Sequence, residues 1–436
     1  MKIAFVTFGC KVNTSEDEAF AADFALKGWQ ISKPDAADVV VINTCAVTET
    51  AAKRCASYMV GLKKKHPKLK IIAAGCLASE RGITLKEKGA DIVVTNGSKS
   101  SLAKHIEDLS HGLLSADESP FFGGGPAIKA TKPEREQLTG EFSEHLAKTR
   151  AFFKIQDGCD ANCAYCIIPK LRGKPKSKPF DEAVKEFQGL LRMGFKEIVL
   201  VGIHIGMYGR GEGYGLKDLL KAISSFDEDY RIRLSSVEVG EVTQELIDLM
   251  AERADKICSH LHIPLQSGSD VILKKMGRQS LSQDYIDACL AAKERIEGLT
   301  VGSDVIVGFP GERDEDFNDT IAALEKARAD FIHVFPYSDR SGTVASLMEG
   351  KLSQKEKEQR ASHLRQLWQE KTHNAMMQMI GKRCRVLTEK DGKGHASNYM
   401  RVSLNEKVPA NTFVDVEITG VSDLLLLGEV RNFSHS

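Results

Sequence analysis

The sequence predicts an α/β chain in three parts: an open parallel α/β domain, a partial TIM-type (β/α)6 barrel and a small C-terminal β-barrel. At 436 residues the chain is too long for one ordinary hydrophobic core, so several domains are expected. Short apolar runs alternate with helical patterns over most of the length, as in βαβ units. After about residue 371 the runs become shorter and turn-bounded, which indicates a β-barrel.

The first hundred residues contain three short runs that are apolar on both faces and therefore suit central strands of a parallel sheet. They cover residues 3–8, 39–43 and 71–74, and a cysteine follows each run within two residues: Cys10, Cys45 and Cys76. Carboxyl ends of parallel strands share one edge of a sheet, so we expect these thiols to meet there. Plain buried thiols are the alternative, but the shared position favours a metal-cluster site. Gly9 and Gly75 allow tight turns beside a bulky ligand.

Glycine, proline and charged residues dominate from Leu109 to about Arg150 without an apolar period, which indicates a linker. We therefore expect the chain to divide into domains over 1–110, 148–371 and 372–436, with the linker over 111–147. The last domain has Tyr399 and Phe413 as its central aromatic residues. Small β-barrels of this kind commonly bind single-stranded RNA, and a purely structural role fits these residues equally well.

Six candidate strands fill the middle of the chain, and helical patterns separate them. They are residues 152–156, 197–203, 231–237, 260–266, 301–309 and 331–337. Loops with unusual glycine, serine and polar residues follow five of the six, which suits close approach to a cofactor. The pattern predicts a partial TIM-type barrel whose site lies at the carboxyl-terminal ends of the strands.

The first of these strands leads into Cys159, Cys163 and Cys166, which are spaced C-x3-C-x2-C. Three thiolates do not complete a structural zinc site, which takes four ligands. They suit a cluster of four irons in which one iron has no protein ligand. Half of a zinc site, completed by a distant residue, is the alternative. The remaining cysteines lack a partner at ligand spacing and are interpreted as plain thiols: Cys55, Cys258, Cys289 and Cys384.

Charge and composition set limits on partners and location. The 60 basic and 60 acidic side chains balance, so any RNA contact would come from local patches rather than from a large positive excess. Two lysine-rich runs, residues 63–70 and 170–178, are candidates for such patches, although solvated loops are the commoner explanation. No apolar stretch is long enough to span a membrane. Ten cysteines without an export signal predict a reducing, cytoplasmic location.

Several motifs together resemble the radical S-adenosylmethionine (SAM) methylthiotransferases, over essentially the full chain. They are FGCKVNTSEDEA, VVINTCAVTETA, AAGC, KIQDGCDANCAYCIIPKLRG, HIPLQSGSDVILKKMGR and DVIVGFPGE. The resemblance implies a cluster domain, a radical SAM barrel and a TRAM domain, with two 4Fe-4S clusters and SAM as cofactors. Cys10, Cys45 and Cys76 would hold an auxiliary cluster, and Cys159, Cys163 and Cys166 the SAM cluster. Tyr165, Glu238 and Gln266 are the candidates for contacts with SAM. Asn162, Lys176 and Lys178 depart from the residues more usual in the family.

Within the family, GCKVN and LVGIHIG resemble the branch that acts on tRNA carrying N6-threonylcarbamoyladenosine beside the anticodon. In that reaction one SAM methylates a sulfur held at the auxiliary cluster, and a second SAM supplies the radical that activates C2 of the base. The implied partners are a tRNA anticodon loop, an electron donor such as flavodoxin or ferredoxin, and a sulfur donor, with no membrane. His204 either faces the substrate or is a buried structural histidine.

Three other readings of the chain stay open at this point. The same chemistry is compatible with isopentenyladenosine in tRNA or with an aspartate of a ribosomal protein as the substrate. From a different class, a non-catalytic iron–sulfur protein that binds RNA or transfers electrons would also carry two clusters.

Overall fold

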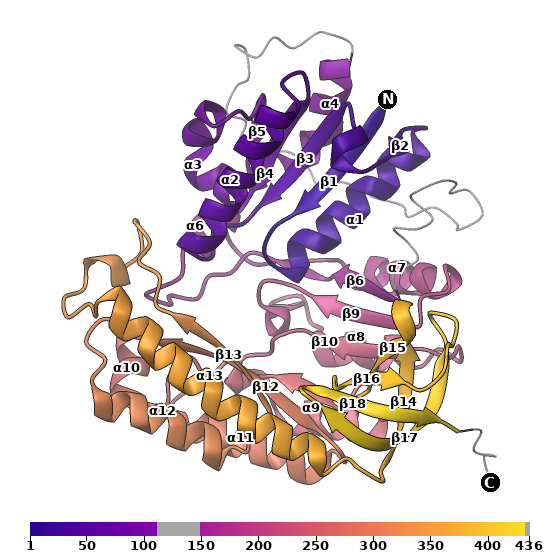
Figure 1. The fold of residues 1–436 in the computed structure, drawn as a ribbon, viewed down its shortest axis with the longest axis vertical. Helices are drawn as coiled ribbons and strands as arrows, with labels where there is room; N and C mark the ends of the chain where they lie inside the picture. Colours follow the sequence, from indigo (N-terminus) through magenta and orange to yellow (C-terminus); the bar gives the residue numbers. More distant parts are fainter. Residues whose placement is uncertain (111–148, 432–436) are drawn as a thin grey trace.

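The computed structural model describes residues 1–110 and 149–431, so the linker predicted over 111–147 lies outside the described residues. Figure 1 shows the N-terminal domain at the top, the central barrel below it and the C-terminal barrel, in yellow, at the lower right. No helix in the described part of the chain is long and apolar enough to cross a membrane. The domain boundaries at residues 110, 148 and 371 stay a prediction.

The N-terminal domain is a parallel sheet in the order β2-β1-β3-β4-β5, as the apolar runs predict. Its strands are β1 (Lys2–Thr7), β2 (Gln30–Ile31), β3 (Val39–Thr44), β4 (Lys70–Gly75) and β5 (Ile92–Val94). Every residue of β3 is buried, because helices cover both faces of the sheet. One face carries α2 (Glu49–Lys65) and α3 (Cys76–Glu87). The other carries α1 (Lys11–Leu26) and α4 (Leu102–Ser110).

The central domain has six parallel strands in chain order, which confirms the partial TIM-type barrel. They are β6 (Arg150–Lys154), β9 (Glu197–Val201), β10 (Arg231–Leu234), β11 (His260–His262), β12 (Thr300–Val307) and β13 (Phe331–Pro336). The sheets β10-β9-β6 and β11-β12-β13 are joined by isolated parallel bridges, including one from Ser236 to His262.

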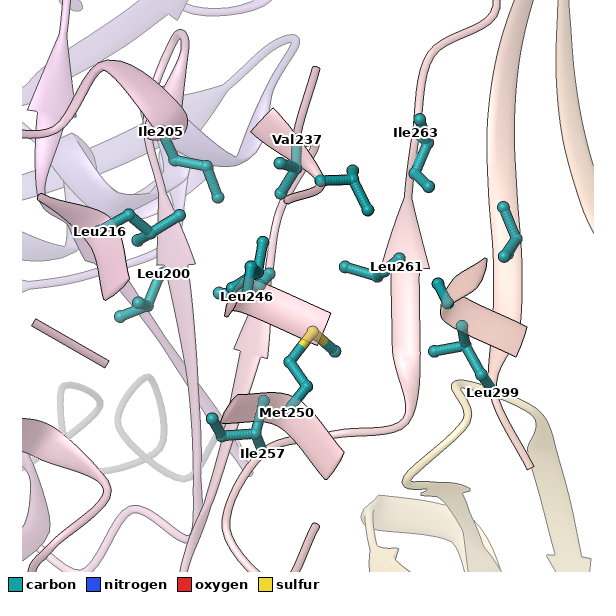
Figure 2. Packing of buried hydrophobic residues seen from close by; sticks show 14 of the residues in the cluster. Leu200, Ile205, Leu216, Val237, Leu246, Met250, Ile257, Leu261, Ile263 and Leu299 are labelled. Carbon is teal, nitrogen blue, oxygen red and sulfur yellow. The ribbon is translucent and has the colours of Figure 1, made fainter. Parts of the chain in front are cut away.

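Helices surround the outside of this barrel, and two shorter helices and a small strand pair lie near its mouth. The outer helices are α7 (Phe180–Arg192), α8 (Leu216–Ile223), α9 (Gln244–Glu252), α11 (Ser282–Arg295), α12 (Asp314–Lys326) and α13 (Gln354–Met377). The smaller elements are β7 (Gln156–Asp157), α6 (Ile168–Arg172), β8 (Lys176–Ser177) and α10 (Asp270–Lys275). Figure 2 shows how Leu200 and Leu261 of the strands pack with Leu246 and Met250 of α9.

The barrel lumen receives the first turn of α1 from the N-terminal domain. Ile198 and Leu200 of β9 belong to the core beneath the outer helices, so the alternate residues Val199 and Val201 face the opposite side. Val12 packs against Val199 and Val201 on that side. The chain segment that follows Cys10 therefore borders the inside of the barrel.

The C-terminal residues form a closed barrel in the order β14-β15-β16-β18-β17, which confirms the predicted small β-barrel. Its strands are β14 (Arg383–Thr388), β15 (Lys393–Ala396), β16 (Arg401–Leu404), β17 (Phe413–Ser422) and β18 (Leu425–Val430). Helix α13 leads into it from the central domain, and Met376 of this helix joins the core of the small barrel with Val386 and Val402.

Candidate active site

Cys10, Cys45 and Cys76 gather at the carboxyl edge of the N-terminal sheet. Cys45 and Cys76 directly follow the neighbouring strands β3 and β4, and both are buried, at 5% and 4% exposure. Cys10 is exposed and precedes α1. Burial raises the pKa of the Cys45 thiol to about 11, and the nearby Cys10 and Cys76 thiols add to the effect. Strands that are distant in sequence thus bring three thiols to one place.

Two glycines are required by this crowded edge. Gly9 has a φ of +101°, and a Cβ on it would lie 2.6 Å from Sγ of Cys45. Gly75 has a φ of +100°, and its Cβ would lie 2.5 Å from Oδ1 of Asn43. Since both positions combine left-handed backbone with a close neighbour, no other residue fits without displacement. All ten cysteines of the chain are free, so no disulfide occupies these thiols.

Cys159, Cys163 and Cys166 lie in the loop between β7 and α6, at the carboxyl-terminal mouth of the central barrel. The backbone holds this loop tightly: the Cys159 N–H donates to the Gly173 carbonyl at 3.0 Å, and the Cys166 N–H to the Cys163 carbonyl at 3.0 Å. Burial raises the pKa of the Cys166 thiol to about 12, and the thiols of Cys163 and Cys159 contribute. This second group of thiols is therefore also compact.

Arg172 connects the two cysteine groups. It ends α6, the helix after the second group, and its Nε donates to Sγ of Cys76 in the first group at 3.3 Å. Its Nη1 pairs with Glu16 at 3.0 Å and with Asp157 at 2.9 Å. The Arg172 side chain is only 1% exposed. In sequence this arginine belongs to a basic run that suggests RNA contact, whereas the fold buries it between two carboxylates.

The three candidates for SAM contacts lie above the barrel strands. Glu238 follows β10 and forms an ion pair with both terminal nitrogens of Arg278. Burial and the neighbouring Cys163 thiol raise the pKa of Tyr165 well above its ordinary value, and Arg278 and Glu238 lie close enough to influence it as well. The structure thus brings Tyr165 and Glu238 together.

Gln266 stands slightly apart from this pair, beyond the end of β11. Its backbone N–H donates to the Asp304 carbonyl at 2.8 Å, and its φ is +67°. Among the described residues no side-chain hydrogen bond holds its amide. A left-handed backbone at a residue other than glycine costs energy and is concentrated at functional sites, which is consistent with a ligand-binding amide at this position.

His204 lies between the second cysteine group and an acidic residue. Its Nδ1 is 3.8 Å from Sγ of Cys159, and its Nε2 is 2.6 Å from Oε1 of Glu241. Its backbone N–H donates to the Gln156 side chain at 2.8 Å. The imidazole therefore borders a candidate cluster ligand, a placement that the sequence alone left open.

A second group of polar side chains, which the sequence did not predict, lies on the strands β11, β12 and β13. Nε2 of His262 lies 3.0 Å and Nδ1 of His333 lies 3.2 Å from the same oxygen of Asp304. Burial opposes ionisation of Asp304, but the two histidines outweigh it and hold its pKa well below the ordinary range. These atoms lie within 4.8 Å of one another, so they are able to share a cation or a polar substrate group. The sequence does contain a signal for this group, because His262, Asp304 and His333 are polar residues within runs that predict buried strands.

Comparisons with known proteins agree with this geometry. Residues 153–324 match the model of the Radical SAM superfamily, and residues 2–96 match that of the uncharacterized protein family UPF0004. The radical SAM methyltransferase TsrM from Kitasatospora setae has a similar fold, with a TM-score of 0.56 over 77% of this chain and 74% of that one, at 13% identity. The central domain is therefore a radical SAM barrel.

Curated relatives extend the match to nearly the whole chain. Threonylcarbamoyladenosine tRNA methylthiotransferase MtaB from Bacillus subtilis is 36% identical over 92% of this chain and 89% of the relative. The protein of that name from Thermotoga maritima is 34% identical over 88% and 85%. A tRNA-2-methylthio-N(6)-dimethylallyladenosine synthase from Thermodesulfovibrio yellowstonii is 32% identical over 97% of each. The chain belongs to the radical SAM methylthiotransferases, transferases that use SAM and two 4Fe-4S clusters.

Proposed function

We propose that the chain adds a methylthio group to C2 of N6-threonylcarbamoyladenosine beside the anticodon of tRNA. The observation that carries the proposal is the pair of three-cysteine groups, with Arg172, from the helix that follows the second group, donating to Cys76 of the first. Each group offers three thiols, which leaves one iron of a four-iron cluster without a protein ligand. Two of the relatives named above, at 36% and 34% identity, carry the name of this activity.

The residues present fit both clusters. The thiols in each group are free and close together, and Gly9 leaves room beside Cys45 where any side chain would collide. Cys159, Cys163 and Cys166 would hold the cluster that binds SAM, and Cys10, Cys45 and Cys76 the auxiliary one. With SAM bound, this pair of cofactors supplies radical chemistry at a carbon that acid–base catalysis does not activate.

The protein's own residues orient the cofactor and exclude water. Tyr165 and Glu238, held by Arg278, and the free amide of Gln266 border the mouth and would position SAM. The His204 side chain pairs with Glu241 and contacts Cys159, so the surroundings of this thiol are polar. The anticodon loop suits such a site, since a single-stranded base is able to leave its stack and enter a lumen. A one-electron donor such as flavodoxin or ferredoxin and a sulfur donor complete the reaction, in the cytoplasm.

The test is a reaction of the anaerobically reconstituted protein with SAM, dithionite and tRNA carrying N6-threonylcarbamoyladenosine, followed by mass spectrometry of the nucleosides. A 2-methylthio product from this tRNA, with little from isopentenyladenosine tRNA, is expected. Product only from the isopentenyl substrate would move the chain to the branch of the Thermodesulfovibrio relative. Absence of 5′-deoxyadenosine would instead support a non-catalytic iron–sulfur protein.

Two triple variants assign the clusters. Replacing Cys159, Cys163 and Cys166 by Ala should remove roughly half of the iron and all SAM cleavage. Replacing Cys10, Cys45 and Cys76 by Ala should remove a similar share of iron, retain SAM cleavage and abolish the methylthio product. Wild-type iron content in the second variant would mean that the N-terminal cysteines are plain core thiols.

A further inference from the structure

Two side chains donate hydrogen bonds to the sulfur of Cys76, a candidate ligand of the auxiliary cluster. Nε of Arg172 lies 3.3 Å and Nδ2 of Asn96 lies 3.4 Å from this atom. Asn96 also donates from Nδ2 to the Leu171 carbonyl at 3.2 Å, so its amide nitrogen rather than its oxygen faces the sulfur. Cys76 is 4% exposed. Both donors therefore contact a sulfur that is shielded from water and that would carry a negative charge when it binds iron.

Arg172 is held in one orientation by partners on several sides. Its Nη1 pairs with Glu16 at 3.0 Å and with Asp157 at 2.9 Å, and its Nη2 donates to Oδ1 of Asn13 at 2.8 Å. These contacts engage both terminal nitrogens of the guanidinium, and the remaining Nε–H points at Cys76. Because the side chain is only 1% exposed, water does little to screen its charge from the sulfur.

Positive charge exceeds negative charge in the network around Arg172. Lys154 pairs with Glu16 at 2.9 Å and with Asp157 at 3.0 Å, and Lys99 also pairs with Glu16. Three cations (Lys99, Lys154 and Arg172) thus share two carboxylates (Glu16 and Asp157). The cation of this network that touches a candidate cluster ligand is Arg172.

Asp17, next to Glu16 in the chain, adds little negative charge to the network. It accepts hydrogen bonds from Thr7 and Asn43, and burial raises its pKa to about 7, so below this pH it is largely protonated. A four-iron cluster held by three thiolates carries a net negative charge, and this charge grows when the cluster takes up an electron. Buried positive charge beside a ligating sulfur therefore stabilises the reduced cluster more than the oxidised one.

We propose that Arg172 and Asn96 raise the reduction potential of the auxiliary cluster through their hydrogen bonds to the Cys76 sulfur. The inference rests on the proposed function, which assigns Cys10, Cys45 and Cys76 to that cluster. Hydrogen bonds to ligating sulfurs and the local net charge are two of the factors that set such potentials. The step concerned is the uptake of one electron by the oxidised cluster from an external reductant. Arg172 and Asn96 are positioning residues, since they act through Cys76.

The experiment measures the midpoint potential of the auxiliary cluster alone. The full-length chain with Cys159, Cys163 and Cys166 replaced by Ala is reconstituted anaerobically, and its cluster is titrated with dithionite while electron paramagnetic resonance follows the reduced form. Asn96→Ala and Asn96→Asp are introduced into this background. The control is Ser101→Ala, which removes a hydrogen bond to the Ser98 carbonyl in the same short helix, η2 (Asn96–Ser101).

Asn96→Ala should lower the reduction equilibrium about tenfold, which is about 59 mV for a one-electron couple. Asn96→Asp should lower it further, because an oxygen with negative charge replaces the donor. Ser101→Ala should keep the potential of the background. Iron content should be the same in all of these proteins. A role of Asn96 in packing alone predicts no such order of potentials.

Arg172 is tested with two variants in the same background. Arg172→Gln should lower the reduction equilibrium by about 10–100-fold, since it removes both the charge and the fixed donor. Arg172→Lys should recover part of this loss, because lysine retains the charge but not the planar fork. If Arg172→Gln fails to load iron, the Asn96 series decides the question.

Potentials of Asn96→Ala and Asn96→Asp that match Ser101→Ala would overturn the inference. Loss of iron in Asn96→Ala would also overturn it, because the residue would then act in assembly of the site. Failure of the proposed assignment looks different: the background variant itself would bind no iron, and no potential would be measured in any of its derivatives.

Discussion

Gly9 controls the space between the start of α1 and Cys45. A methyl group at this position would lie 2.6 Å from the Cys45 sulfur, so Gly9→Ala should prevent the three N-terminal thiols from holding a cluster. Gly28→Ala is a matched control, because its φ of +81° imposes similar backbone strain while no atom lies within 4 Å. We expect Gly9→Ala to lose roughly half of the reconstituted iron but to retain SAM cleavage. Full iron content in Gly9→Ala, measured beside Gly28→Ala, would contradict this role.

Asp17 predicts a pH dependence of stability. Burial raises its pKa to about 7, although hydrogen bonds from Thr7 and Asn43 oppose the shift. Between about pH 4 and 7 the unfolded chain therefore ionises this carboxyl while the folded protein keeps it protonated. The free energy of unfolding falls as pH rises through this window, by at most about 1.4 kcal/mol per pH unit. Asp17→Asn should remove this contribution.

The measurement for Asp17 is urea unfolding of wild type and Asp17→Asn at several pH values. The difference in stability between them should shift in favour of the asparagine variant as pH rises toward 7 and then stay constant. A difference that does not vary with pH would show that the carboxyl ionises equally in both states.

Single residues also show what sequence patterns are able to predict. The two cysteine groups can be recognised in the sequence. The ligands of one are closely spaced along the chain, and those of the other each follow a predicted strand. Arg172 and Lys178 look alike in a basic run, yet the fold pairs the first with Glu16 and the second with Glu186. The sequence gives no sign of the contact between Lys11 and Tyr399 either, because only the folded chain brings these two residues together.

At the scale of elements, the strands were predictable and their ends were not. Apolar runs located all six strands of the central barrel. The fourth was expected over residues 260–266, but β11 ends at His262. Pro264 has no N–H for the ladder, and Gln266 has left-handed backbone, so regular pairing stops there. The interruption leaves Gln266 outside the regular strand, with an isolated bridge to Val305.

The C-terminal barrel docks on the central one through buried arginine. Nη1 of Arg233 donates to the Ser397 carbonyl at 2.8 Å, and its Nε donates to Glu197 at 2.9 Å. Arg233→Met should therefore lower the free energy of unfolding by about 3–5 kcal/mol, since Glu197 would lose a buried partner. Arg385→Met, which removes an exposed pair with Asp229 across the same interface, should cost about 0–1 kcal/mol.

Chemical denaturation of both variants beside wild type measures this difference. Equal costs would mean that the two barrels dock without help from the buried network. The same contacts explain why deleting the C-terminal residues is a poor test of RNA binding: removal of those carbonyls would leave Glu197 as the acceptor of Arg233 and expose a buried surface of the central barrel.

At the scale of the whole molecule, the net charge is zero, so electrostatic attraction to RNA should depend on a few exposed lysines. Lys174 and Lys176 are exposed beside the second cysteine group, whereas Lys178 is paired with Glu186. Replacing Lys174 and Lys176 by Gln should lower the slope of log K against log salt for tRNA by about 1.4–1.8, from two phosphate contacts. Lys178→Gln is the control within the same run, and its slope should match wild type. An unchanged slope in the double variant would identify these lysines as solvated residues only.

The arrangement of the three parts was beyond prediction, although each part was predictable alone. Local periodicity reports which face of a strand or helix is buried, but it does not report which domain covers the lumen. Here Val12 of α1 and Tyr399 of the C-terminal barrel both reach into the central domain. The residues that line the inside of the central barrel therefore come from all three parts of the chain.

The Lys11 ammonium lies 5.9 Å from the centroid of the Tyr399 ring, although about 390 residues separate the two along the chain. A ribosome that adds about 5–20 residues per second takes roughly 20–80 s to synthesise that stretch. During this time the N-terminal sheet and both sets of cysteines have already emerged, while the floor of the lumen has not. A nascent or prematurely terminated chain therefore presents all six candidate cluster ligands before its barrel has a floor, so translation itself orders cofactor loading before completion of the barrel.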